Sequence, residues 1–97
     1  MTAEQARLTL YVSGDSTLSR RAVVNIRRIM AEYLDDACLL EIVDVTRSPE
    51  RAEDARILAT PTLVRLTPQP ERRVTGDLAD ADRVLVALDL MDDSSGR

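Results

Sequence analysis

The sequence contains no histidine and only one cysteine, Cys38. A single cysteine excludes a disulfide within the chain, and a zinc site made of cysteine and histidine has too few ligands here. The missing histidine also excludes the Ser-His-Asp and Cys-His systems of nucleophilic catalysis. Because buried cysteines usually behave as small apolar side chains, we interpret Cys38 as part of the core.

Aromatic residues and lysine are scarce too. Tyr11 and Tyr33 are the two aromatic residues, and there is no lysine. Few rings are therefore available to stack against nucleic-acid bases, and a net charge of −4 opposes binding to phosphates. We expect no nucleic-acid partner. All basic residues are arginines, which suit bidentate ion pairs at protein interfaces.

The chain also lacks long apolar runs and glycine-rich loops. Without a long apolar run we expect no membrane-spanning segment and no membrane partner. Residues 1–5 lack the basic and apolar regions of a signal peptide, so we expect a cytoplasmic protein. Gly14 and Gly76 stand alone after predicted strands, without a glycine-rich phosphate-binding pattern, and are interpreted as turn residues. No cofactor is expected.

Pairs of acidic residues are the remaining candidates for catalysis. They occur near predicted helix ends, as Asp35-Asp36, Glu53-Asp54 and Asp92-Asp93 do. Acids at such positions usually cap helices and keep the surface solvated, whereas a catalytic carboxylate needs a desolvated pocket to raise its pKa. We therefore expect a non-catalytic protein with no metal site.

What the sequence does contain is sufficient for one folded domain. It has 97 residues, of which 44% are hydrophobic and 31% are charged, an ordinary composition for a globular protein. We expect one domain over residues 1–97, in which residues 1–7 and 92–97 are flexible.

The spacing of apolar residues predicts alternating strands and helices. Strands are expected over residues 8–12, 38–45, 62–66 and 72–75, and helices over residues 18–34, 49–56 and 79–91. In the first helix the apolar stripe consists of Ala22, Ile26, Ile29, Met30 and Tyr33. The second helix must end by Thr60, because Pro61 disfavours helical geometry in the residue before it.

This order, βαβαββα, predicts an α/β fold with a four-stranded mixed sheet. The helix between the first two strands makes them parallel with a right-handed crossover, and the short turn between the last two makes a hairpin. The plan is thioredoxin-like. Thioredoxins, however, carry Cys-x-x-Cys after the first strand, and residues 13–18 contain no cysteine. Dithiol–disulfide exchange is therefore excluded.

Arginines cluster near the predicted hairpin. Arg72 and Arg73 begin its second strand, and Arg65 lies in its first. Two interpretations of these arginines are equally well supported. They form a small basic patch that binds a partner, or they are solvated strand positions that discourage unwanted edge pairing.

Several stretches together resemble the KaiB circadian-clock family. They are residues 8–14, 43–45, 49–53, 57–63, 72–78 and 84–90. The segment 57–63, Ile-Leu-Ala-Thr-Pro-Thr-Leu, is similar to the most recognisable motif of that family. The likeness covers about residues 8–91.

The resemblance implies a non-catalytic regulator that binds the hexameric ATPase KaiC and modulates its phosphorylation cycle. It also implies KaiA or a SasA-type histidine kinase as further partners, and a dimeric or tetrameric ground state. By resemblance, the binding surface involves the short helix and the segment after it, around Arg56 and Ile57. We add Arg72 and Arg73 as candidate partner contacts.

KaiB proteins are metamorphic, and their ground state has a rearranged second half of order βαββααβ. Such a switch requires two folds within a few kcal/mol of each other. The hinge is expected after Pro61. Residues expected to serve the switch or the structure around it are Ala59, Thr60, Pro61, Thr62, Pro68, Pro70, Gly76, Asp77, Ala87 and Asp89.

Two departures from the family pattern bear on this switch. Gln69 replaces the middle one of three consecutive prolines, and Ala87 stands where the family often has glycine. Alanine in a helix is more stable than glycine by about 0.5–1 kcal/mol. We therefore expect a bias toward the thioredoxin-like state.

Other functions stay open at this point. One is a KaiB-like stress or signalling adaptor outside a clock, which the sequence does not separate from a clock protein. Another is the sensory domain of a SasA-type kinase, although residues 72–78 fit KaiB better. A redox enzyme is opposed by the missing cysteines.

Overall fold

The computed structural model describes residues 5–34 and 38–90. The strands are β1 (Ala6–Val12), β2 (Cys38–Asp44), β3 (Thr62–Thr67) and β4 (Arg72–Thr75). The helices are α1 (Thr17–Ile29), the π-helical turn η1 (Met30–Leu34), α2 (Pro49–Asp54) and α3 (Ala81–Ala87). The elements thus follow the predicted order βαβαββα, with η1 continuing α1.

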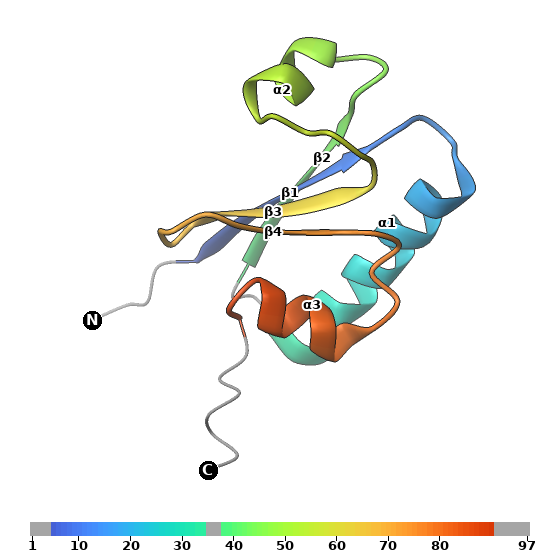
Figure 1. Ribbon diagram of the computed structural model, residues 1–97. Helices are drawn as coiled ribbons and strands as arrows, with labels where there is room; N and C mark the ends of the chain where they lie inside the picture. The colour runs from blue at the N-terminus through green and yellow to red at the C-terminus, as the bar shows by residue number, and fades with distance from the viewer. Residues whose placement is uncertain (1–4, 35–37, 91–97) are drawn as a thin grey trace.

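The strands form a four-stranded sheet in the order β2-β1-β3-β4. β1 and β2 are parallel, as a helical connection requires, and their register runs from the pair Ala6 and Cys38 to the pair Val12 and Asp44. β3 is antiparallel to both β1 and β4. The predicted mixed sheet is confirmed, and β2 and β4 lie at its two edges (Figure 1).

The two faces of the sheet are covered unequally. α1 and α3 pack on one face, and α2 lies over the other (Figure 1). The largest fully buried side chains of the α1 and α3 face are Leu8, Leu10, Ile26, Ile29, Leu63, Leu85 and Leu88. On the α2 face, Tyr11, Val43 and Val64 form a smaller cluster. No residue of α2 is buried, so few contacts hold this helix in place.

The start of β1 corrects one expectation. Residues 6 and 7 were expected to be flexible, but they belong to β1. The reason is pairing on both sides, since Arg7 lies opposite Leu39 of β2 and Thr67 of β3. The expectations for residues 1–4, for the pair at 35–36 and for residues 92–97 lie outside the described residues.

The end of the first helix corrects another expectation. Ala22, Ile26 and Ile29 are buried as predicted, but the Tyr33 side chain is 52% exposed and Leu34 is buried instead. A π-helical turn holds more residues than an α-helical turn. The inward-facing position therefore moves by one residue, from Tyr33 to Leu34, within η1.

The last helix is shorter than predicted. Asp80 caps its start by accepting a hydrogen bond from the Arg83 backbone N–H. Its C-terminal end is a Schellman motif, in which the Asp89 and Leu90 N–H groups donate to the carbonyls of Val86 and Leu85 at 3.0 and 2.8 Å. This motif requires the left-handed φ of +56° found at Asp89. The helix therefore stops at Ala87 rather than at residue 91, and Ala87 is helical as predicted.

Candidate protein-binding site

The segment from Arg56 to Thr60 leaves the C-terminal end of α2 and leads into β3. α2 ends at Asp54, two residues before the predicted end, in a second Schellman motif. The Arg56 and Ile57 N–H groups donate to the carbonyls of Glu53 and Ala52 at 3.0 and 2.9 Å. Arg56 takes a left-handed φ of +56°, which costs a non-glycine residue about 1–2 kcal/mol. Tertiary contacts must hold this turn in place.

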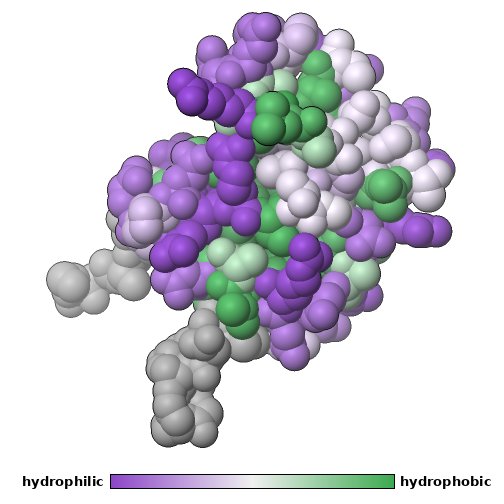
Figure 2. All heavy atoms as spheres, in the orientation of Figure 1, coloured by the Kyte–Doolittle hydropathy of each residue, from purple (hydrophilic) through white to green (hydrophobic). Residues whose placement is uncertain are grey.

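Ile57 and Leu58 face opposite environments. Ile57 is half-buried and packs on the cluster of Tyr11, Val43 and Val64. Leu58 is 98% exposed. In the orientation of Figure 2 the hydrophobic residues form separate areas rather than one continuous patch. The predicted contact Ile57 therefore anchors the segment, and Leu58, which sequence reasoning missed, is its exposed apolar side chain.

Arg73 joins β4 to the end of α2. Its Nη2 donates to the Ala55 carbonyl at 2.7 Å, and its Nη1 donates to the Arg56 carbonyl at 3.2 Å. Nη2 also forms an ion pair with Glu71 at 2.8 Å. Two predicted partner residues, Arg56 and Arg73, are thus brought together, although they are 17 positions apart in the chain.

Arg65, Arg72 and Arg73 do not gather in one basic patch, so this one of the two interpretations is wrong. Successive strand residues point to opposite faces, so Arg72 and Arg73 lie on different sides of β4. Arg65, opposite Arg72 in the register, is only 3% exposed. Its guanidinium donates to the carbonyls of Pro70 at 2.6 Å and Asp89 at 3.4 Å. Arg65 therefore ties the β3–β4 turn to the end of α3.

The opposite side of α2 is fastened to β2. Arg51 donates to both carboxylate oxygens of Glu41, at 3.0 and 3.1 Å. These bonds hold the pKa of Glu41 below its ordinary value. Both side chains are about half exposed, so the pair orients α2 more than it stabilises the fold.

Several residues expected to serve a conformational switch form hydrogen bonds between neighbouring segments of the fold. Thr62 Oγ1 donates to the Ala59 carbonyl at 2.6 Å, and the Gly76 N–H donates to the Pro61 carbonyl at 3.0 Å. Asn25 of α1 donates to the Asp77 carbonyl at 2.8 Å. The peptide bonds before Pro61, Pro68 and Pro70 are cis.

Hydrogen bonds to hydroxyl and carboxylate side chains hold the loop after β1 in place. Ser16 caps α1 by accepting from the Ser19 N–H at 3.2 Å, and Ser19 Oγ accepts from the Ser13 N–H at 3.0 Å. Asp44 Oδ1 accepts from the Gly14 N–H at 3.0 Å and from the Thr46 hydroxyl and N–H at 2.7 and 2.9 Å. These bonds, that of the Thr46 hydroxyl above all, lower the pKa of Asp44.

Replacing Asp44 by asparagine should make the free energy of unfolding fall less steeply as the pH is lowered into the acid range. A lowered folded-state pKa means that the ionised Asp44 contributes stability above the ordinary aspartate pKa of about 3.9. That contribution is lost as the pH falls through the lowered pKa. Urea unfolding between pH 6 and pH 2 measures it. Asp54→Asn, which replaces an exposed carboxylate of α2, is the control. If Asp44→Asn left the pH dependence of the free energy of unfolding unchanged, Asp44 would not have the stabilising role assigned to it.

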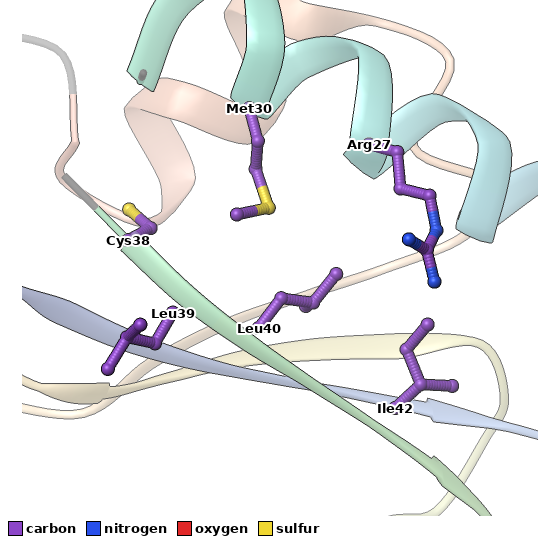
Figure 3. A pocket seen from close by; sticks show the side chains of 6 residues that line it. All are labelled: Arg27, Met30, Cys38, Leu39, Leu40 and Ile42. Carbon is purple, nitrogen blue, oxygen red and sulfur yellow. The ribbon is translucent and has the colours of Figure 1, made fainter. Parts of the chain in front are cut away.

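A groove of about 590 Å³ lies along the outer edge of β2. Its lining residues are Arg27, Met30, Cys38, Leu39, Leu40 and Ile42. In Figure 3, Arg27 and Met30 reach down from the helix toward β2. Cys38 belongs to the core, as predicted, and burial raises the pKa of its thiol. At neutral pH the thiol form dominates, which makes Cys38 a poor nucleophile.

Among residues 5–34 and 38–90, no group of three or more histidine, cysteine, aspartate or glutamate side chains is arranged to hold a metal ion. In the same part of the chain, no helix has the length and apolar character needed to cross a membrane.

Comparison with known proteins identifies the family. A family model described as the KaiB domain matches residues 9–90. The chain belongs to the KaiB family. The circadian clock protein KaiB3 of Synechocystis sp. is 43% identical over 84 residues, which cover 87% of this chain and 82% of that protein. The circadian clock oscillator protein KaiB of Prochlorococcus marinus is 44% identical over 84 residues, covering 87% and 72%.

Solved structures support the predicted thioredoxin-like plan of this KaiB-family chain. The N-terminal domain of Synechococcus elongatus SasA has a TM-score of 0.74 at 26% identity, covering 95% of this chain and 90% of that chain. Mitochondrial thioredoxin 3 of Saccharomyces cerevisiae has a TM-score of 0.71 at 15% identity, covering 91% and 80%. The thioredoxin likeness concerns the fold alone.

Proposed function

We propose that this protein is a non-catalytic regulator that binds a KaiC-type hexameric ATPase in the cytoplasm and modulates its phosphorylation cycle. Membership of the KaiB family and relatives named as circadian clock proteins support a role in a timing system. KaiA-like proteins or a SasA-type kinase are the further partners of this proposal.

The observation that carries the proposal is the exposed Leu58 on an anchored segment. Leu58 is 98% exposed, while the packing of Ile57 and the Arg73 hydrogen bonds to Ala55 and Arg56 hold the backbone just before it. Burying a leucine side chain against a partner gains about 1.5–3 kcal/mol. The Arg56 side chain, exposed and without an ion pair among the described residues, supplies a charge beside it.

Size-exclusion chromatography with a KaiC-type hexamer and ATP tests the proposal. We expect the chain to co-elute with the hexamer, and to do so best with variants that mimic phosphorylation. Separate elution with every phosphorylation mimic would overturn it. An insulin-reduction assay tests the non-catalytic part, because a rate above the protein-free blank would contradict it.

A second candidate function is the sensory domain of a SasA-type kinase. The TM-score of 0.74 with the SasA N-terminal domain supports it. The 43% and 44% identities with KaiB proteins favour the first proposal. An adaptor outside a clock is the reading to adopt if the chain binds neither a KaiC-type hexamer nor a SasA-type kinase.

We further propose that the chain has an alternative ground-state fold, dimeric or tetrameric, and that Ala87 biases it toward the thioredoxin-like state. Ala87→Gly should lower the free energy of unfolding by about 0.5–1 kcal/mol, because glycine weakens the last turn of α3. Urea unfolding measures this loss, and NMR secondary shifts report which fold is populated.

Ala79→Gly is the matched control for this prediction, since residue 79 precedes α3. Strand-type secondary shifts over residues 83–90 in the unmodified protein would contradict the proposed bias. An equal loss of stability in the two glycine variants would contradict the role assigned to Ala87.

A further inference from the structure

Three anchors hold the end of α2 to the rest of the molecule. Ala55 and Ile57 pack on the cluster of Tyr11, Val43 and Val64. Arg51 pairs with Glu41 of β2. The third anchor, Arg73, comes from β4 and reaches the backbone just before Leu58 by hydrogen bonds to the Ala55 and Arg56 carbonyls.

The geometry of the Arg73 contact depends on its forked guanidinium. Two of its nitrogens reach two successive carbonyls, those of Ala55 and Arg56, and the nitrogen that donates to Ala55 also donates to Glu71. Carbonyls at a helix C-terminus carry partial negative charge and attract a cation. Lysine keeps the charge but is a point donor that does not span two acceptors in this way.

The face of the sheet to which Arg73 points depends on the pairing of β3 with β4. Arg73 lies opposite Val64 in the antiparallel register of β3 and β4. Both residues therefore point to the α2 face, and a shift of one residue would turn Arg73 to the other face. The guanidinium meets α2 only when β4 is paired in this register.

We propose that Arg73 is a positioning residue, which fixes the Arg56–Leu58 turn for partner binding and makes that turn depend on the pairing of β4. The proposal rests on the function proposed above. It assigns Arg73 a role inside the protein rather than a charge contact with the partner. The proposed partner-binding segment, which precedes Pro61, thereby depends on the arrangement of the strands that follow Pro61.

Arg73→Lys with Arg72→Lys as the matched control tests the proposal. The two arginines are neighbours on one strand and both are exposed, but only Arg73 contacts α2. Hydrogen exchange of the Arg56 and Ile57 amides, both hydrogen-bonded in the Schellman motif, reads out the turn in the free protein. We expect exchange to be about 10-fold faster in Arg73→Lys and unchanged in Arg72→Lys.

Affinity for a KaiC-type hexamer gives the second readout. We expect Arg73→Lys and Arg73→Met to weaken binding equally, by about 10-fold. Wild-type affinity in Arg73→Lys with a loss in Arg73→Met would identify a direct charge contact and overturn the positioning role. Wild-type amide exchange in Arg73→Lys would overturn it as well.

Native-state exchange at low denaturant tests the dependence on β4. In the unmodified protein we expect the Arg56 and Ile57 amides to open in the same step as the β4 amides, and in Arg73→Lys to open separately and more easily. Separate opening in the unmodified protein would overturn the coupling. These measurements need no partner, so they stand apart from a failure of the unmodified chain to bind the hexamer.

Discussion

Leu58→Asp should weaken binding to a KaiC-type hexamer by at least about 30-fold, the loss typical of a hot-spot residue. The side chain is 98% exposed, so the free protein gains nothing from its apolar character. A partner that buries this position would have to desolvate a carboxylate instead of an apolar leucine side chain. Isothermal titration or surface plasmon resonance with the hexamer measures the change.

Val24→Asp is the control for this substitution. Val24 is 64% exposed and lies on α1, which packs on the other face of the sheet from α2. We expect its affinity for the hexamer to match that of the unmodified chain, and both variants to keep the unfolding midpoint. Equal losses in the two variants would point to a general effect of charge, and the site would then not be at Leu58.

Leu10→Ala should lower the free energy of unfolding by about 2–5 kcal/mol, a large share of the 5–15 kcal/mol available to a domain. Leu10 is fully buried and lies between Ile42 of β2 and Leu63 of β3. The surrounding core contains aliphatic side chains and no aromatic ring, so the loss comes from vacated aliphatic contacts. Urea or thermal unfolding followed by circular dichroism measures it.

Leu58→Ala makes the same chemical change at a site that is 98% exposed. It should alter the free energy of unfolding by no more than about 0.5 kcal/mol. The pair of variants therefore separates burial from side-chain chemistry. A similar cost at both positions would mean that Leu58 is buried in solution, which would also remove the basis of the proposed binding site.

The arrangement of elements was predictable because apolar periodicity distinguishes strands from helices. Alternation over β1 and the three- and four-residue spacing of Ala22, Ile26 and Ile29 are local signals. The π-helical turn was not predictable in this way, since it changes the spacing by one residue without a sequence marker. Its consequence was the wrong assignment of Tyr33 to the core.

The candidate site was predicted in part. The family resemblance indicated Arg56 and Ile57, and the cluster of arginines near the hairpin indicated Arg73. The role of each depends on contacts between distant residues: Arg73 reaches Ala55 and Arg56, and Arg65 is buried against Pro70 and Asp89. Leu58 was missed because an apolar residue next to Ile57 is expected to be buried. Its side chain is exposed because the backbone turns at Arg56, which the sequence does not indicate.

The scarcity of aromatic residues gives the protein a convenient optical property. Tyr11 is 4% exposed and lies in the cluster against which Ala55 and Ile57 pack, whereas Tyr33 is 52% exposed on η1. In a chain without tryptophan, tyrosine supplies the near-ultraviolet fluorescence. A Tyr33→Phe variant confines that emission to one ring beneath the end of α2. The molecule thus carries an intrinsic fluorophore at the base of its proposed binding surface, with no dye attached.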